Sequence, residues 1–479
     1  MREIVFDRSM LQDLRSIRLI RGMGQKDLAV EAGVPLAELS KVERGLVLPD
    51  ARFLEAVGRV LSVSSHELHE AQLALLESAT PGEGYVTARS EDSYVITRRE
   101  EPSRSRIPVL DLFCGVGGFS HGFQRTGRFQ VVGGIDLLPD RISTFAENHP
   151  TATAFCADIR SVGIDPLAQT THQPQVIIGG PPCQGFSSIR PFRTLTEKDP
   201  RNNLFEHFVL VVAALKPKWF VLENVVGLIT HDKGRALQAI LDSFKSVGYR
   251  VDWKVLNAAL YGLPQRRERL VVVGNSIGQS FRWPAPTHFF NGRSMAGKQH
   301  GQIADQLPLL GEMLEPAVTV MEAIHDLPEI EAGASSDKYR ENVVSTVYER
   351  TMRGNTKVLT LHESTHHTPR MLEIIREAGH NRYDLPQQLT SSGFSSSYSR
   401  LEPDLPSVTL TVNFVHPASN KCIHPYQDRA LTPREGARLQ GFEDSYRFKG
   451  TRSQIVKQIG NAVPPLLGEM IARALLGQW

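Results

Sequence analysis

The sequence predicts an α/β fold with a doubly wound, mainly parallel sheet, preceded by a small all-α domain. Beyond residue 107, short and continuously apolar runs of strand length alternate with helical segments, as expected for strands buried on both faces. Residues 10–68 instead show helical periodicity, broken at glycines and prolines. The 479 residues exceed one ordinary domain, so more than one compact unit is expected.

The composition is that of a globular chain. Hydrophobic residues make up 41% and charged residues 22% of it, and no apolar run reaches the roughly 18 residues that span a bilayer. The first residues carry acidic side chains and no apolar signal segment, so we expect a protein of the cytoplasm and not of a membrane. The formal net charge is only +2, so nucleic-acid binding would need a local basic cleft.

The four cysteines are Cys114, Cys156, Cys183 and Cys422. They show no CxxC spacing and are too few for a disulfide framework or a zinc ribbon. The sequence therefore predicts no metal site and leaves at least one thiol free for chemistry.

The first domain, residues 1–76, contains a helix, a tight turn and a second helix. The first helix is expected from Gln25 to Ala32 and the second from Leu36 to Arg44, ended by Gly45. The pattern resembles the helix-turn-helix domains of phage-repressor type. A helical protein-interaction bundle is the alternative, because Leu36 is a weak base reader.

That resemblance implies contacts to DNA from both helices. Gln25 would cap the first helix against a phosphate, and the second helix would face the major groove. The residues expected to contact DNA are Gln25, Leu36, Ala37, Ser40 and Lys41.

Residues 77–106 lose this periodicity and are rich in Thr, Gly, Ser, Pro, Arg and Glu, which predicts a linker. The apolar runs that follow predict the strands of the sheet. They are Val109–Leu112, Val131–Ile135, Val176–Gly179, Trp219–Leu222 and Leu270–Val273.

A glycine-rich turn, Asp111 to Ser120, follows the first of these strands and precedes a helix. Such glycines let the backbone approach a ligand at the carboxyl edge of a sheet, but this turn is not GxGxxG, which disfavours a dinucleotide. Asp136 and Asp158 end the next two strands. A carboxylate after the second strand suits a ribose diol and one after the third suits an adenine amino group. Together they predict a nucleoside pocket without phosphate-binding residues.

A reactive site is predicted at the following strand ends. Cys183 comes after a buried strand and the rigid Pro181-Pro182, where a nucleophile can project from the sheet edge, and basic neighbours could lower its thiol pKa. Glu223 closes the next strand and can share a proton with a substrate ring nitrogen. Strand alternation places Arg267 and Arg269 on one face, where they could clamp a substrate oxygen and Glu223.

Three motifs in this order resemble those of bacterial DNA cytosine-5 methyltransferases: Gly-Pro-Pro-Cys-Gln-Gly-Phe-Ser at 180–187, Glu-Asn-Val at 223–225, and Gln-x-Arg-x-Arg at 265–269. Residues 431–442 and 458–465 look like the last two motifs of that family. The resemblance covers residues 108 to near the C-terminus. It implies the class I methyltransferase fold, S-adenosyl-L-methionine (AdoMet) as cofactor and double-stranded DNA as partner. It also implies a prokaryotic protein whose place in the cytoplasm is the nucleoid.

The resemblance also implies roles for individual residues in cofactor binding. Phe113 would stack on the adenine and Asp136 would hold the ribose hydroxyls, although the family more often has glutamate at that place. The expected cofactor-binding residues are Phe113, Cys114, Gly115, Gly117, Gly118, Asp136, Asp158, Ile159, Pro181, Asn461 and Val463.

In the implied mechanism the Cys183 thiolate adds to carbon 6 of cytosine, so that carbon 5 becomes nucleophilic. Glu223 would serve ring N3, and Arg267 and Arg269 would serve O2. Because carbon 6 is unreachable in a stacked pair, the base must be flipped out. Residues 186–203 are rich in arginine and small polar residues and predict a catalytic loop, with DNA contacts from Ser187 and Arg190.

The resemblance divides the rest of the chain into an AdoMet-binding catalytic part at 107–283, a target-recognition region at 284–409, and C-terminal motifs at 410–479 that complete the catalytic domain. The region 284–409 contains His362, His366 and His367. No partner cysteines or HExxH pattern accompany these histidines, so loop histidines are favoured over metal ligands.

Several alternatives stay open at this point. RNA methylation is disfavoured, because tRNA-modifying relatives usually carry Cys-Phe-Thr soon after Glu-Asn-Val, and this chain continues with Gly227-Leu228-Ile229-Thr230. The helix-turn-helix could repress the chain's own gene from an operator, anchor the enzyme on substrate, or form a dimer. A cognate restriction endonuclease, and with it a restriction-modification system, is a further expected partner.

Overall fold

The computed structural model describes residues 14, 18, 23–43, 51–61, 93–170, 173–182, 204–290, 314–386, 389 and 396–479. The chain forms two compact units, Met1–Thr87 and Ala88–Trp479. Within the described ranges, no helix combines the length and apolar character that crossing a bilayer requires.

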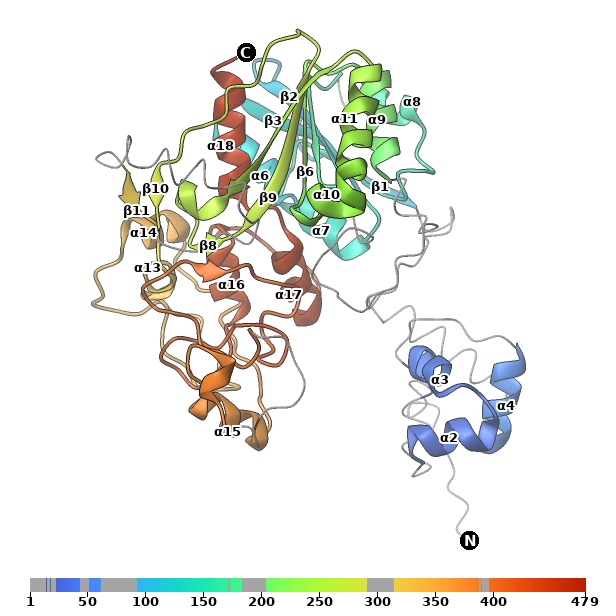
Figure 1. The fold of residues 1–479 in the computed structure, drawn as a ribbon, viewed down its shortest axis with the longest axis vertical. Coiled ribbons are helices and arrows are strands. Elements are labelled where there is room, and N and C mark those ends of the chain that lie inside the picture. The colour runs from blue at the N-terminus through green and yellow to red at the C-terminus, as the bar shows by residue number, and fades with distance from the viewer. Residues whose placement is uncertain are drawn as a thin grey trace. The chain divides into compact units, whose positions relative to one another are not determined.

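The first unit contains three described helices, α2 (Gln25–Ala32), α3 (Leu36–Glu43) and α4 (Ala51–Leu61) (Figure 1). α2 ends at Gly33, whose left-handed φ of 66° lets its N–H bond back to Ala29 and Val30. Leu28, Leu39 and Val57 are fully buried and join the helices in one small core. The predicted helix, turn and helix are therefore present.

The second unit is built on an eight-stranded sheet with the order β1-β4-β3-β2-β5-β6-β9-β7. β9 is antiparallel to both of its neighbours and β1 is antiparallel to β4, whereas the remaining pairs are parallel. This confirms the mainly parallel sheet. The strands are β1 (Tyr94–Ile96), β2 (Ile107–Leu112), β3 (Phe129–Asp136), β4 (Thr153–Cys156), β5 (Val176–Gly179), β6 (Trp219–Val225), β7 (Arg250–Asn257) and β9 (Glu268–Asn275).

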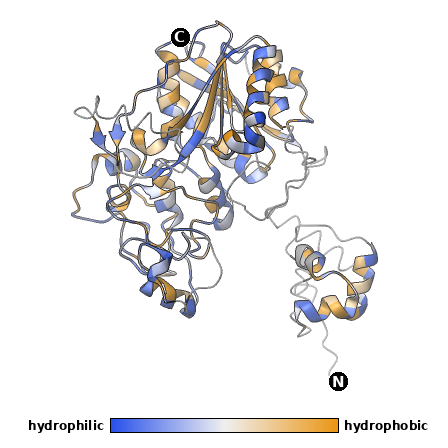
Figure 2. Ribbon diagram, in the orientation of Figure 1, coloured by the Kyte–Doolittle hydropathy of each residue, from blue (hydrophilic) through white to orange (hydrophobic). Residues whose placement is uncertain are grey.

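The helices that pack on this sheet are α6 (Gly118–Arg125), α7 (Pro139–Asn148), α8 (Ile164–Thr170), α9 (Leu204–Leu215), α11 (Arg235–Ser246) and α18 (Pro465–Leu476). α8, α9 and α11 cover the face that carries Leu110 and Leu222. α6, α7 and α18 cover the opposite face, which carries Val109 and Val131 (Figure 1). The central strands and the helix surfaces turned toward them are apolar (Figure 2), as a sheet buried on both faces requires.

The remaining elements are α10 (Gly227–Thr230), η4 (His231–Gly234), η5 (Ala258–Tyr261), β8 (Gln265–Arg266), β10 (His288–Phe289), β11 (Glu315–Pro316), α13 (Val320–Ile324), α14 (Val347–Arg353), α15 (Pro369–Glu377), η7 (Arg382–Asp384), β12 (Ser407–Val408), α16 (Pro433–Leu439) and α17 (Arg452–Asn461). One apolar cluster joins α13 and α14 to α16 and α17. The residues on either side of the predicted boundary at 409/410 thus share a core.

The prediction of a linker at 77–106 needs a correction, because the strand β1 lies inside this range. Tyr94, Val95 and Ile96 pair with Cys156, Phe155 and Ala154 of β4, at the edge of the sheet. Only three residues form this strand, and Tyr94 and Val95 are exposed, so they left no apolar run in the sequence. The catalytic unit therefore begins before residue 107.

Candidate active site

The glycine-rich turn connects β2 to α6 at the carboxyl edge of the sheet. Phe113 has a left-handed φ of 60°, which is uncommon for a residue with a side chain and typical of functional turns. Gly118 permits a close approach, since a Cβ there would lie 2.3 Å from the Val463 carbonyl oxygen. The turn is thus packed directly against the residues that follow α17.

Asp136 and Asp158 lie at the ends of β3 and β4, the two strands next to β2 on one side. The Asp136 carboxylate accepts hydrogen bonds from the backbone N–H of Gly115 and of Leu138, both at 3.0 Å. Asp158 is bonded to Arg160 Nε at 2.9 and 3.0 Å, and this hydrogen bond lowers the pKa of the Asp158 carboxyl. Both acids are therefore placed where a nucleoside could meet them.

The other residues expected at this pocket differ in exposure. Cys114 is buried, and burial raises the pKa of its thiol well above the usual value, so it serves as packing. Ile159 is buried in the core beneath the pocket, and Phe113 packs against the same core. Asn461 is exposed at the end of α17, and Val463 is half-buried with its carbonyl against the turn.

The structure brings Glu223 and Arg269 together at neighbouring strands. Glu223 lies in β6 and Arg269 in β9, and Arg269 Nε is 2.8 Å from Glu223 Oε1. Both side chains are largely buried, which strengthens their attraction by excluding water. The pair is one half of the predicted reactive site.

The backbone that leads to Cys183 is anchored beside this pair. Asn224 Nδ2 donates to the Pro181 carbonyl at 3.1 Å, and a Cβ on Gly180 would lie 3.1 Å from Glu223 Oε2. The sequence argument missed this role of Asn224, although the residue stands inside the Glu-Asn-Val motif. Cys183, Ser187 and Arg190 themselves lie outside the described residues.

Arg267 does not share the face of Arg269. Its side chain is only 2% exposed, and it donates to the carbonyl oxygens of Leu410 at 3.3 Å and Ala462 at 3.0 Å. The chain leaves the strand geometry at Arg267, between β8 and β9, so the alternation that predicted a common face is broken. Arg267 was expected to contact the base. In the structure its hydrogen bonds instead connect it to the C-terminal segments around Leu410 and Ala462.

Two buried glutamines make further hydrogen bonds to the C-terminal segments. Neither was predicted from the sequence. Gln265 Nε2 donates to Leu439 O at 3.0 Å and to Gln440 Oε1 at 2.8 Å. Gln440 Nε2 in turn donates to Ile459 O at 2.6 Å. Both glutamines lie within motifs that the sequence resemblance had already singled out, at 265–269 and 431–442, and this could have drawn attention to them.

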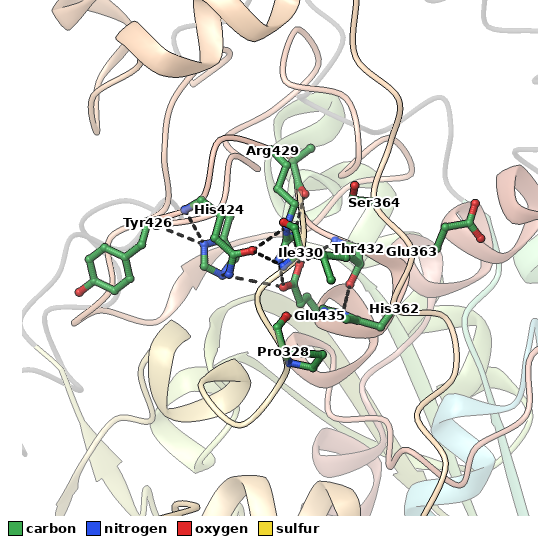
Figure 3. Close-up of polar contacts among 12 residues, drawn as sticks. Pro328, Ile330, His362, Glu363, Ser364, His424, Tyr426, Arg429, Thr432 and Glu435 are labelled. Atoms are coloured by element: carbon green, nitrogen blue, oxygen red, sulfur yellow. Dashed lines mark hydrogen bonds and ion pairs between the residues drawn. The ribbon is translucent and has the colours of Figure 1, made fainter. Parts of the chain in front are cut away.

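Of the predicted loop histidines, His362 is buried, His367 is half-buried and accepts a hydrogen bond from the Ala430 N–H, and His366 is exposed. His362 is buried, with Nδ1 3.1 Å from Thr432 Oγ1 and Nε2 2.9 Å from the Pro328 carbonyl (Figure 3). The two terminal guanidinium nitrogens of Arg429 donate to the Glu435 carboxylate at 2.7 and 2.8 Å, and this pair lies next to His424. No group of three potential metal-binding side chains occurs in the part of the chain that the structure describes.

In the first unit, the residues expected at DNA fall on α2 and α3. Gln25 is half-buried at the first position of α2, and Leu36 is 44% exposed at the start of α3. Ala37, Ser40 and Lys41 belong to α3, and their side chains lie outside the described residues.

Comparison with known proteins identifies the second unit. The family model of the C-5 cytosine-specific DNA methylases matches residues 107–477. The chain belongs to this family. Residues 14–68 of this methylase also match a helix-turn-helix family model, which confirms the predicted helix-turn-helix of its first unit.

Individual relatives agree with this assignment. The methylase is 35% identical to the type II methyltransferase M1.HphI of Haemophilus parahaemolyticus, over 77% of this chain and 87% of the relative. It is 32% identical to the type II methyltransferase M.AgeI of Thalassovita gelatinovora, over 77% and 99%. A solved putative DNA modification methyltransferase of an Escherichia coli prophage superimposes with a TM-score of 0.60 at 27% identity, over 78% of this chain and 99% of that one.

C-5 cytosine methylases of this fold use AdoMet, and the residues at the turn of this methylase fit that cofactor. The turn offers the half-buried ring of Phe113 for the adenine, and Gly115 carries open space where a Cβ would stand. Each oxygen of the Asp136 carboxylate keeps a free lone pair for the ribose hydroxyls after its bond to the backbone.

Proposed function

We propose that this methylase modifies cytosines within specific double-stranded DNA sequences, and that Cys183 attacks carbon 6 of the flipped target base. The Glu223–Arg269 ion pair carries this proposal. It lies beside Gly180 and Pro181, and the chain continues directly from there to Cys183. A thiol that follows Pro182 would have an acid and a cation close by, the two groups that the chemistry of the ring requires.

Carbon 5 of cytosine is a poor nucleophile until sulfur adds to carbon 6. The Cys183 thiolate forms that bond, Glu223 shares a proton with N3, and Arg269 donates to O2 while it holds the Glu223 carboxylate. AdoMet bound at the turn would supply an electrophilic methyl group: carbon 5 would bond to that methyl as the methyl–sulfonium bond breaks, and S-adenosylhomocysteine would leave. Loss of the carbon-5 proton to water and cleavage of the carbon–sulfur bond then release 5-methylcytosine and restore the thiolate.

The remaining site residues support these steps. Phe113, Asp136 and Asp158 hold the cofactor, Asn461 and Val463 close its pocket, and Ser187 and Arg190 contact DNA next to the flipped base. Flipping is required because a stacked pair hides carbon 6.

Labelled AdoMet and a duplex library that covers all short sequence contexts test the activity. The library should acquire 5-methylcytosine in one sequence context, and a library without it would refute the proposed function. Replacement of the target by 5-fluorocytosine tests the covalent step. Fluorine cannot leave as a cation, so the adduct should persist and add the mass of the duplex to the protein.

Cys183→Ser is the matched variant for the covalent step. It should form no adduct and no 5-methylcytosine, because the alcohol is a far weaker nucleophile than a thiolate, while AdoMet binding measured by calorimetry persists. A Cys183→Ser protein with most of its turnover would remove Cys183 from the mechanism.

The proposal extends to a restriction-modification system with a cognate endonuclease, because the relatives above are named type II methyltransferases. DNA from cells that express the methylase should resist an endonuclease in lysates of the source cells. Unmethylated DNA should be cut at the sequence that the methylase modifies in the duplex library. Equal cutting of both DNAs would contradict this extension.

For the first unit we propose that it binds an operator of the methylase's own gene as a dimer. Its match to the helix-turn-helix family and its separate core support this. Footprinting should show one protected, two-fold symmetric site upstream of the gene. Uniform protection of all DNA would instead favour simple anchoring on substrate, and a monomer in sedimentation would contradict the dimer.

A further inference from the structure

His149 lies buried beneath the glycine-rich turn, although it comes from the end of α7. It is fully buried, and its Nε2 is 3.2 Å from the carbonyl oxygen of Gly117. Its Nδ1 faces the side-chain amide oxygen Oε1 of Gln124 in α6. The imidazole therefore connects the turn to the two helices that flank it.

The turn is shaped around this ring. Gly117 has a left-handed φ of 86°, and a Cβ there would lie 2.3 Å from His149 Nε2 and 2.9 Å from the Phe145 ring. Only glycine combines this conformation with this contact. The ring and the glycine thus fit each other as a pair.

The hydrogen-bond partners determine which nitrogen carries the proton. A carbonyl oxygen can only accept, so Nε2 must carry the hydrogen that bonds to Gly117. Burial lowers the pKa of His149 to about 3, which keeps the ring neutral and leaves Nδ1 as an acceptor. Oε1 of Gln124 faces Nδ1 in the structure, so this tautomer requires the opposite orientation of the Gln124 amide, with its NH₂ group donating to Nδ1.

A second side chain holds the same turn from the C-terminal part of the chain. Tyr446 is 3% exposed and donates its hydroxyl to the Val116 carbonyl. Its ring packs against Phe442 and His121, at centroid distances of 4.8 and 5.0 Å. Successive carbonyls of the turn are therefore fixed from two sides.

We propose that His149 is a positioning residue for AdoMet: its neutral ring, protonated at Nε2, holds the Gly117 turn in the form that receives the cofactor. The inference rests on the proposed placement of the cofactor at this turn. His149 acts through the backbone of Gly117 and does not touch the reacting atoms.

Paired substitutions test this role. His149→Leu removes the donor, whereas His149→Gln places an amide N–H near the position of Nε2. In calorimetry without DNA, we expect His149→Leu to raise the Kd for AdoMet about five- to tenfold, as the loss of one neutral hydrogen bond predicts, and His149→Gln to recover most of that affinity. In turnover assays the KM for AdoMet should rise by a similar factor, while the KM for DNA stays within about twofold.

His362→Leu is the matched control. His362 is also buried and bonded to a backbone carbonyl, that of Pro328, but it does not contact the glycine-rich turn. It should lower the Tm and leave the AdoMet Kd unchanged. Tyr446→Phe should weaken AdoMet binding, and its effect should not add to that of His149→Leu, since both residues hold one turn.

The proposal is overturned if His149→Leu binds AdoMet like the wild type, or if His149→Leu and His149→Gln lose the same affinity. Failure of the proposed function would appear differently, as wild-type protein that binds AdoMet but forms no 5-methylcytosine.

Discussion

Arg267 and Arg269 stand two residues apart and have separate surroundings. Arg269 pairs with Glu223, whereas Arg267 binds the carbonyls of Leu410 and Ala462. The sequence could not separate them, because a periodicity argument assumes an unbroken strand and the break at Arg267 is visible only in the backbone. The Glu223–Arg269 pair itself was predictable, since both residues belong to buried runs at one sheet edge.

This difference predicts distinct defects. Arg269→Gln should lower kcat by about 10²- to 10³-fold, as expected when a donor to a developing charge is lost, and should also lower the Tm, because Glu223 loses its buried partner. Its loss of activity should therefore far exceed what its loss of stability explains. Arg267→Gln should chiefly lower the Tm, because buried carbonyls lose their partners at about 1–3 kcal/mol each. Thermal unfolding and single-turnover kinetics distinguish the two. An Arg267→Gln protein with normal Tm and abolished turnover would instead support the original prediction that Arg267 contacts the base.

Asp111 gives a prediction about pH. Burial raises the pKa of its carboxyl to about 8, even though Ser120 donates a hydrogen bond to it. The folded state therefore keeps a proton that the unfolded state loses near its ordinary pKa of 3.8, so this group's contribution to stability falls as pH rises from about 4 to 8. Asp111→Asn should gain Tm relative to the wild type progressively over that range. A Tm difference independent of pH would contradict an ionising Asp111.

Among the elements, five strands buried on both faces were predictable as apolar runs, namely β2, β3, β5, β6 and β9. β4 is also buried but has only four residues, one of them Thr153, and was expected only from Asp158, the acid that follows it. β7 alternates between exposed and half-buried positions along much of its length, and β1 is only three residues long. The short helices α13 and α14 share a core with α16 and α17, and that association depends on contacts far apart in the sequence.

The packing of α6 against α18 depends on glycine at the contact. A Cβ on Gly122 would lie 2.1 Å from the Pro465 carbonyl and 2.6 Å from the Glu469 nitrogen, both backbone atoms. Gly122→Ala should therefore separate the helices and cost about 1–3 kcal/mol. Gly163→Ala is the control, since its Cβ would meet only Pro166 at 3.5 Å. Thermal unfolding should show a lower Tm for Gly122→Ala alone, and equal values would refute the close contact.

At the scale of the whole molecule, the two units have separate cores, and β1 belongs to the second. A chain that starts at Ala88 should keep its Tm and its kcat on short duplexes within about twofold, while it loses the operator footprint. A chain that starts at Ile107 lacks β1 and exposes the edge of β4, so it should be less stable and prone to aggregate. Equal stability of the two chains would show that β1 adds nothing to the sheet.

The close fit of Gly118 under Val463 also bears on how the protein is made. The turn after β2 and the residues around Val463 are separated by more than 300 positions, yet the first is packed only when the second is in place. During synthesis the ribosome releases the turn long before residues 452–476 emerge, and contacts between such distant segments form late. A nascent chain therefore cannot pack this turn, and we expect the methylase to gain activity only after the residues around Val463 have emerged.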